Sequence, residues 1–218
     1  MERIRAFLRA FTPRRRIVYV LGTLLLACGI TLNTRTDLGV APILSVAYNL
    51  GELLGIPFSV MSFLYYCFLI LVQRMLLGKR FDHIQWLQLL ASFLTSFFIG
   101  LFSRVIPPAE NLPLRIFFLL AAILLTGTGI ILSVGADFVP NPGDGTANAI
   151  ALRTGRSLGF SKNLLDIGSF LTALALGLLF RGRIMGVGPG TVVTMLLTGR
   201  VVALFQKPVL RLARLTEE

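Results

Sequence analysis

The sequence predicts an all-α polytopic membrane protein with six full transmembrane helices, two short Pro-led re-entrant or half helices, and two homologous halves. Three observations predict this fold: an apolar composition, six long apolar runs, and a similarity between the halves at a spacing of one hundred residues. Of the 218 residues, 55% are hydrophobic and 14% are charged, whereas a soluble domain has roughly 45–50% apolar and about 25% charged residues. So few charged residues cannot cover a soluble protein of this size, and most of the chain must face lipid.

Six apolar runs are long enough, or nearly so, to cross the hydrocarbon core of a bilayer, which takes about 20 residues. The last run is short before Arg200 and reaches full length only if that side chain extends to the membrane surface. The runs are continuous rather than alternating, which favours helices over a β-barrel. They cover Ile17–Thr34, Ile56–Val72, Ile84–Ser103, Ile116–Ala136, Asn163–Phe180 and Ile184–Gly199.

Two further segments, Val40–Leu54 and Pro142–Thr154, are apolar but shorter and interrupted by polar residues. At about 1.5 Å per residue each would extend about 20 Å, less than the ~30 Å hydrocarbon core. Pro42 and Pro142 stand at or near their starts. We therefore expect half helices or re-entrant segments.

The two halves resemble each other at an offset of one hundred residues, most clearly in the pairs Asp37/Asp137 and Pro42/Pro142. We assign residues 17–107 to a first membrane repeat and 114–206 to a second, within one membrane domain. If the short segments re-enter, each half has three spans and the halves are inverted repeats, a recurring plan among secondary transporters. If the short segments span, the repeats are parallel.

Basic residues are concentrated in a segment at residues 1–16 and in the gaps between the apolar runs, and the formal net charge is +11. Their distribution places both termini in the cytoplasm, including the tail at residues 207–218. It does not separate the inverted from the parallel arrangement. The expected partner of these charges is the lipid bilayer. Nucleic acid is excluded, because no polar surface lies between the basic residues.

Three stretches of the second half carry a resemblance to a known group: Ala136–Gly145, Ser161–Asp166 and Gly186–Thr191. They look like the signature of the YczE/YyaS/YitT group of bacterial integral membrane proteins. The first half is similar to the opening pattern of that group at Thr36–Pro42. The resemblance implies a multi-pass protein of the bacterial cytoplasmic (inner) membrane and supplies no substrate.

Ionisable side chains at membrane depth are costly and usually face protein or a water-filled cavity. Several polar residues cluster in sequence around the short segments. Gln88 is added as a candidate pore-lining amide, because it lies on the third long run roughly where the glycine-rich stretch falls in the other half. The candidate set for substrate or ion binding is Asp37, Asp137, Asn141, Asp144, Asn148, Lys162, Asp166 and Gln88. A structural interpretation stands beside it: Asn141–Asp144 has the residues of an ordinary helix start, and Lys162 with Asp166 suits an ion pair within one helix.

Small and helix-breaking residues form a second set, for which we expect a role in close helix packing. The glycine-rich stretch near residue 188 lacks the lysine and the preceding strand of a phosphate-binding loop. The set is Pro42, Pro142, Gly143, Gly145, Gly186, Gly188 and Gly190.

No His, Cys and acidic residues have the spacing of metal ligands, and the single histidine, His83, lies in a loop. We therefore expect no enzyme, no metal and no cofactor. The leading hypothesis is a small-molecule or ion transporter with an acidic site between the halves; a homodimer is compatible with its size. The alternatives are a substrate-binding membrane subunit of a larger transporter and a non-transporting membrane scaffold or regulator. The charge of the solute stays open, because aspartates favour a cation and helix N-termini favour an anion.

Overall fold

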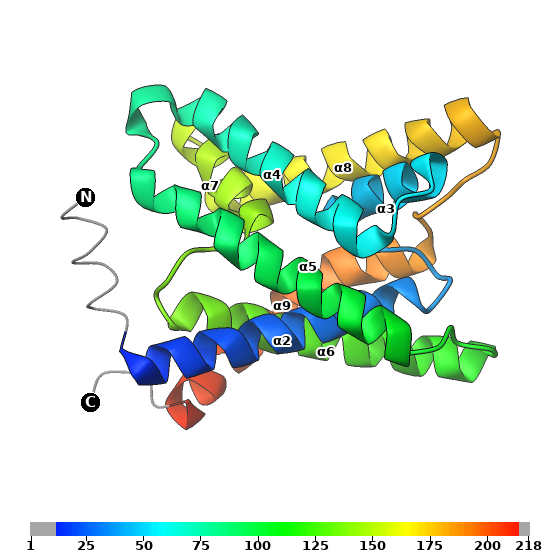
Figure 1. The fold of residues 1–218 in the computed structure, drawn as a ribbon, viewed down its shortest axis with the longest axis horizontal. Coiled ribbons are helices and arrows are strands. Elements are labelled where there is room, and N and C mark those ends of the chain that lie inside the picture. The colour runs from blue at the N-terminus through cyan, green and yellow to red at the C-terminus, as the bar shows by residue number, and fades with distance from the viewer. Residues whose placement is uncertain (1–11, 214–218) are drawn as a thin grey trace.

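The computed structural model describes residues 12–213, which contain eight α-helices, two short 3-10 helices and no strand (Figure 1). The α-helices are α2 (Pro13–Thr34), α3 (Pro42–Leu54), α4 (Phe58–Leu77), α5 (Gln88–Val105), α6 (Leu112–Gly135), α7 (Pro142–Thr154), α8 (Leu158–Arg181) and α9 (Pro189–Leu212). The 3-10 helices η1 (Gly78–Arg80) and η2 (His83–Leu87) lie between α4 and α5.

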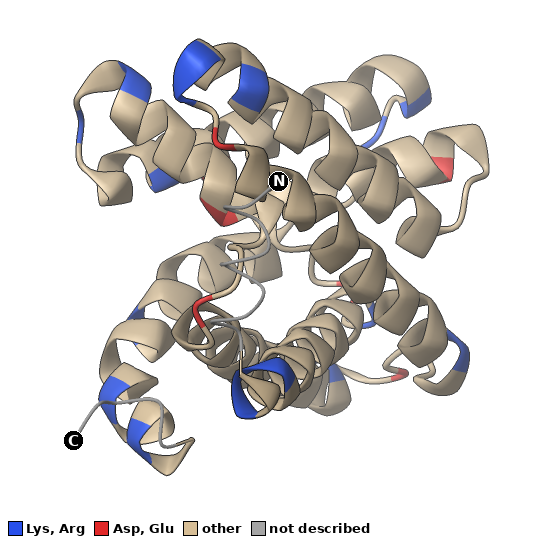
Figure 2. Ribbon diagram, turned by 60° about the vertical axis from the view of Figure 1, so that its left-hand side comes forward, with Lys and Arg blue, Asp and Glu red and all other residues tan. Residues whose placement is uncertain are grey.

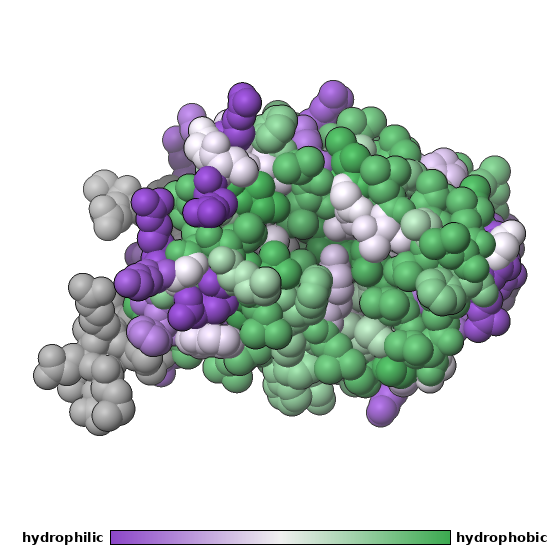
Figure 3. Space-filling model, turned by 90° about the horizontal axis from the view of Figure 1, so that it is seen from above, coloured by the Kyte–Doolittle hydropathy of each residue, from purple (hydrophilic) through white to green (hydrophobic). Residues whose placement is uncertain are grey.

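Six of these helices, α2, α4, α5, α6, α8 and α9, are long and apolar enough to cross a membrane. The prediction of an all-α, multi-pass membrane protein is confirmed. The surface agrees with it: apolar side chains cover the body of the molecule, and hydrophilic residues gather toward its two ends (Figure 3). Lys, Arg, Asp and Glu lie mainly at helix ends and in loops (Figure 2).

The predicted bounds change most at the last span. Helix α9 begins at Pro189, not at Ile184, because Gly186 adopts a positive φ of 65° and Pro189 occupies the first turn. The helix then continues through the exposed Arg200 to Leu212, into the predicted tail. At the other terminus α2 begins inside the predicted basic segment, with Thr12 as its N-cap. Residues 1–11 and 214–218 of the two terminal segments lie outside the described residues.

Helices α3 and α7 have 13 residues each and the same local design. Each starts with a proline in its first turn and ends at a glycine, Gly55 or Gly155, with a φ of 68°. Only glycine adopts this left-handed conformation without a steric cost, so both helices end there. The second of the two predicted segments has the same bounds as α7.

Both short helices have the arrangement expected of re-entrant helices (Figure 1). Asp37, just after α2, and Glu52, near the end of α3, line the same cavity, so α3 returns to the end of the bundle where α2 finished. The Arg14 guanidinium at the start of α2 donates to the carbonyl of Ala213 at 2.6 Å, so the described chain also begins and ends at one side. Each half therefore has three helices that are long enough to span, and the two halves run in opposite directions (Figure 1).

Helices of one half pack against helices of the other half. Helices α2 and α6 pack closely, since the backbone of Gly129 approaches Leu26 and that of Gly29 approaches Thr126. Helix α3 packs on α8, and α7 packs on α4 in the same way. One relationship is not matched: α4 packs against α5, whereas α8 and α9 make no comparable contact. The two halves therefore differ in how their last two long helices pack.

Candidate functional site

The two re-entrant helices meet at their N-terminal ends, between the two halves. A Cβ built on Gly143 would lie 2.9 Å from Cδ1 of Ile43, the residue at the same position in the first half. Gly143 therefore allows the two helix starts to approach each other. Pro42 and Pro142, one residue earlier in each helix, are buried.

The start of α7 is held by a buried pair of amides. Gln73 and Gln88 donate to each other at 3.1 and 3.0 Å, and the Gln73 amide also donates to the carbonyl of Pro142 at 3.1 Å. A Cβ on Gly145 would come within 2.8 Å of Gln73 Oε1, so the glycine leaves room for the pair. Gln88, proposed from the sequence to bind a solute, has no exposed surface here. Gln73 was missed as a site residue; the available signal was an amide directly after the second apolar run.

Asn141 and Asp144 occupy the first turn of α7. The Asn141 side chain accepts a hydrogen bond from the Gly143 amide at 3.0 Å, as an N-cap residue does. The structural interpretation of Asn141 is therefore confirmed. Asn148, farther along the same helix, is exposed.

Asp144, Lys162 and Asp166 form the charged cluster of the second half. The Lys162 ammonium lies 3.3 Å from Asp166 and 3.8 Å from Asp144. Only 8% of the Asp166 side chain is exposed, against 33% for Asp144. A buried carboxylate needs such a partner, because burial of an unpaired charge is strongly unfavourable. The cluster lies near the start of α8, on the side of the termini.

Asp37 and Asp137 do not join this cluster. Each follows a long helix, each has a φ of 55°, and about four fifths of each side chain is exposed. Asp37 pairs with Arg115 at 3.1 Å, and Asp137 pairs with Arg15 at 3.2 Å. Because the halves are inverted, these turns lie at opposite ends of the molecule. The expectation that all four aspartates line one chamber is therefore not met.

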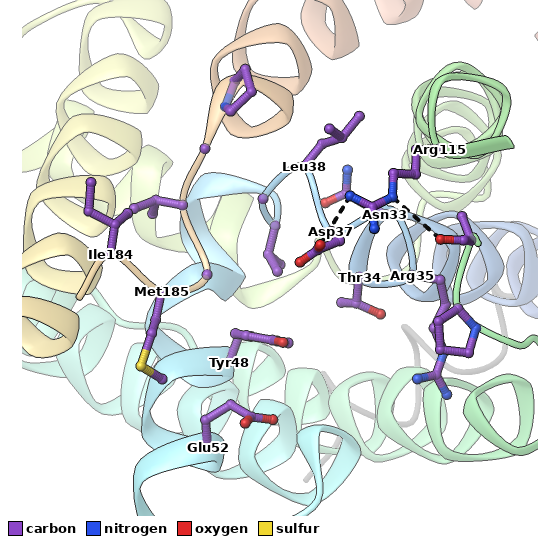
Figure 4. A pocket seen from close by; sticks show the side chains of 18 of the residues that line it. Asn33, Thr34, Arg35, Asp37, Leu38, Tyr48, Glu52, Arg115, Ile184 and Met185 are labelled. Atoms are coloured by element: carbon purple, nitrogen blue, oxygen red, sulfur yellow. Dashed lines mark hydrogen bonds and ion pairs between the residues drawn. The ribbon is translucent and has the colours of Figure 1, made fainter. Parts of the chain in front are cut away.

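A cavity of about 580 Å³ lies between the halves, at the end away from the termini (Figure 4). We call it the distal pocket. Of the predicted residues only Asp37, Gly186 and Gly188 line it. Its charged and aromatic polar side chains are Arg35, Asp37, Tyr48, Glu52, Arg115 and Arg183.

Two loops that pair through their backbones form one wall of the distal pocket. The Val40 amide donates to the carbonyl of Gly186 at 2.9 Å, and the Gly190 amide donates to that of Leu38 at 2.7 Å. A Cβ on Gly188 would lie 2.6 Å from the Leu38 carbonyl oxygen. The predicted close packing at this glycine-rich stretch is thus loop against loop rather than helix against helix.

Arg115 and Arg183 were missed in the sequence, and Arg35 and Glu52 were left out of the candidate set, because the pocket charges come from distant segments. Arg35 follows α2, Glu52 lies on α3, Arg115 is in the first turns of α6, and Arg183 follows α8. Each also stands near a span end, where basic residues are ordinary. One signal for Arg115 was available: it lies one hundred residues after Arg15. This relation is informative only once the structure shows that both arginines form ion pairs.

The opposite end of the molecule has a smaller cavity, of about 180 Å³, beside Leu77 and Arg153. There Tyr19 and Phe138 stack edge to face with ring centroids 4.9 Å apart, within a cluster that includes Val18 and Val139. Phe138 and Val139 correspond in position to Leu38 and Gly39 of the distal pocket. Larger side chains thus stand at this end at the positions where Leu38 and Gly39 line the distal pocket.

A comparison with sequence families matches residues 13–207 to the model of a family of unknown function, DUF6198. The chain belongs to DUF6198. The match begins with α2 and extends into α9, so it includes every residue of the distal pocket and of the charged cluster. Searches of curated proteins and of solved structures each found no match to the chain.

The DUF6198 description names no activity, so function must be argued from the pocket and the charged cluster. No finding links the chain to the YczE/YyaS/YitT group, and that resemblance stays a prediction.

Proposed function

We propose that this DUF6198 protein is a small-molecule or ion transporter of the bacterial cytoplasmic membrane that works by alternating access, with both termini in the cytoplasm. The observation that carries the proposal is the difference between its two ends. The distal pocket has about 580 Å³, whereas the cavity beside Leu77 and Arg153 at the other end has about 180 Å³, and Tyr19 packs against Phe138 there. Two inverted halves in different arrangements can exchange those arrangements, which moves access from one side to the other.

The junction of the re-entrant helices supplies the barrier between the two sides. Ile43 and Gly143 are in contact there, with the distal pocket on one side and the Asp144–Lys162–Asp166 cluster on the other. Helix starts that meet inside the membrane are a recurring feature of transporter sites. A solute that leaves the distal pocket would pass this junction to reach the charged cluster.

The charged cluster fits the acidic site of the proposal. A cation or proton that binds Asp144 or Asp166 competes with the Lys162 ammonium, which now neutralises both. Release of Lys162 would change the contact between α7 and α8, which carry the two sides of the cluster. Solute binding is thereby coupled to movement of a re-entrant helix.

The distal pocket also bears on the alternatives. A scaffold requires no polar cavity between its halves, and this cavity has lining residues from both. It therefore favours a carrier over a scaffold. A substrate-binding subunit would have the same pocket but would give no flux without its ATPase.

The test is flux in reconstituted proteoliposomes, measured with a panel of labelled amino acids, sugars, inorganic ions and organic ions. We expect uptake of at least one solute, and we expect Asp144→Asn and Asp166→Asn to abolish it without loss of expression. Glu110→Gln, an exposed loop residue, is the matched control and should transport normally. Unchanged uptake in both aspartate variants would refute the acidic site. No uptake of any solute, with an ATPase retained on purification from cells, would favour the subunit alternative.

A further inference from the structure

The distal pocket contains charges of both signs that have no ionic partner in the described part of the chain. The carboxylate of Asp37 is neutralised by Arg115. The carboxylate of Glu52 and the guanidinium of Arg183 form none of the ion pairs between described residues. Both residues are exposed, so two groups of opposite charge in the pocket lining are accessible to a ligand.

Arg35 provides a further cation in the same pocket. One of its terminal nitrogens, Nη2, donates to the backbone carbonyl of Ser103, and no carboxylate pairs with it. Its Nε atom is buried and has no hydrogen-bond partner. A buried N–H without an acceptor is unfavourable, and a bound anionic group could supply the acceptor.

The opposite charges stand on different elements of the pocket wall. Figure 4 shows Glu52 and Tyr48 on one side, both from α3, and Arg35 on another, after the end of α2. A ligand between these walls would present one charged end to each. The volume of about 580 Å³ lies within the usual range of small-molecule sites.

We propose that the distal pocket binds a small zwitterion with one carboxylate and one ammonium group, as in a free amino acid. Its carboxylate pairs with Arg35 and Arg183, and its ammonium group pairs with Glu52. A ligand with only a negative charge would be repelled by Glu52, and a ligand with only a positive charge would be repelled by the two guanidinium groups. Only a ligand with both charges can pair with Glu52 and with the arginines. The assignment rests on the proposed function, because it names the solute class of the same pocket.

Tyr48, on the same side of the pocket as Glu52, supports this assignment (Figure 4). Burial raises its pKa above the ordinary value, and the neighbouring Glu52 and Asp37 carboxylates raise it further, while Arg35 and Arg183 act in the opposite direction. Its hydroxyl therefore stays protonated at neutral pH. A neutral hydroxyl can donate to a carboxylate or accept from an ammonium group.

Thermal unfolding of the purified protein in detergent tests the site without any need for flux. The probes are the twenty L-amino acids at a fixed millimolar concentration. For those that raise the unfolding temperature, the amide and the deaminated acid of the same compound follow. We expect at least one amino acid to bind, and to bind roughly 10-fold or more tightly than either single-charge analogue, because each analogue leaves one charged partner unpaired.

Two substitutions separate the ends of the ligand. Glu52→Gln should weaken amino-acid binding roughly 10-fold and remove the advantage over the deaminated acid. Arg183→Gln should reduce the advantage over the amide, and it avoids the structural contact that Arg35 makes with Ser103. Glu110→Gln and Arg104→Gln, exposed residues at the same end but outside the pocket lining, are the controls and should bind normally.

The outcomes distinguish this inference from the proposed transport. If no amino acid shifts the unfolding temperature, or if the single-charge analogues bind as tightly, the zwitterion site is overturned. Amino-acid binding in a protein that shows no uptake of the same compound would retain the site and contradict transport. Uptake of a sugar or metal ion without amino-acid binding would support transport and overturn the zwitterion site.

Discussion

Arg15 pairs with Asp137 at 3.2 Å, and the residues one hundred positions away, Arg115 and Asp37, form the same pair at 3.1 Å. Each pair joins one half to the other, one pair at each end of the molecule. The pairs are crossed: the arginine at the start of one half meets the turn after the first helix of the other. This is the geometry expected where two inverted halves pack through equivalent surfaces.

The exposed aspartates of these pairs should matter more for backbone conformation than for charge. We expect Asp137→Asn to change the free energy of unfolding by less than about 1 kcal/mol, because exposed ion pairs contribute little. Asp137→Val should cost more, roughly 1–2 kcal/mol, because a β-branched residue disfavours a φ of 55°. Denaturant unfolding in detergent measures both. Equal effects of Asn and Val would contradict the conformational argument.

Gly129 should be essential to the contact between α2 and α6. A Cβ at this position would lie 2.5 Å from the backbone nitrogen of Leu26, which cannot move aside as a side chain can. We expect Gly129→Ala to lower the free energy of unfolding by roughly 1–3 kcal/mol. The matched control is Gly168→Ala inside α8, where no atom lies within 4 Å and the change should be neutral or stabilising. A Gly129 variant as stable as this control would show that the helices are not so close.

The Gln73–Gln88 pair should show strong energetic coupling. Gln73→Leu leaves Gln88 buried without its partner, and we expect it to destabilise the protein by roughly 1–3 kcal/mol. Gln73→Leu combined with Gln88→Leu removes both polar groups and should be less destabilising than the sum of the single changes. A double-mutant cycle measures the difference. Additive single effects would mean that the amides do not support each other.

Lys162 should be less replaceable than either of its carboxylate partners. Lys162→Gln leaves the nearly buried Asp166 without a cation, whereas Asp166→Asn leaves Lys162 beside Asp144. We therefore expect Lys162→Gln to lower the unfolding temperature more than Asp166→Asn does. Combining the two substitutions should restore part of the loss. If the Lys162→Gln variant were more stable than Asp166→Asn, a group other than Lys162 would have to neutralise the Asp166 carboxylate.

The helical fold was predictable because its causes are local. The length and continuity of the apolar runs determine the spans, and proline followed thirteen residues later by glycine determines the bounds of α7. The likeness of Asp37 to Asp137 likewise appeared in the sequence, and the two residues do share a φ of 55°.

The sequence by itself therefore determined the membrane class, the number of long helices and the two short ones, all of which follow from the solvation of segments within about 25 residues. Only the tertiary structure decided which charges meet. Arg35, Glu52 and Arg183 belong to three separate elements, and inversion of the halves sends Asp37 and Asp137 to opposite ends. Such pairings depend on how whole helices pack against each other, and no local pattern in the sequence encodes that outcome.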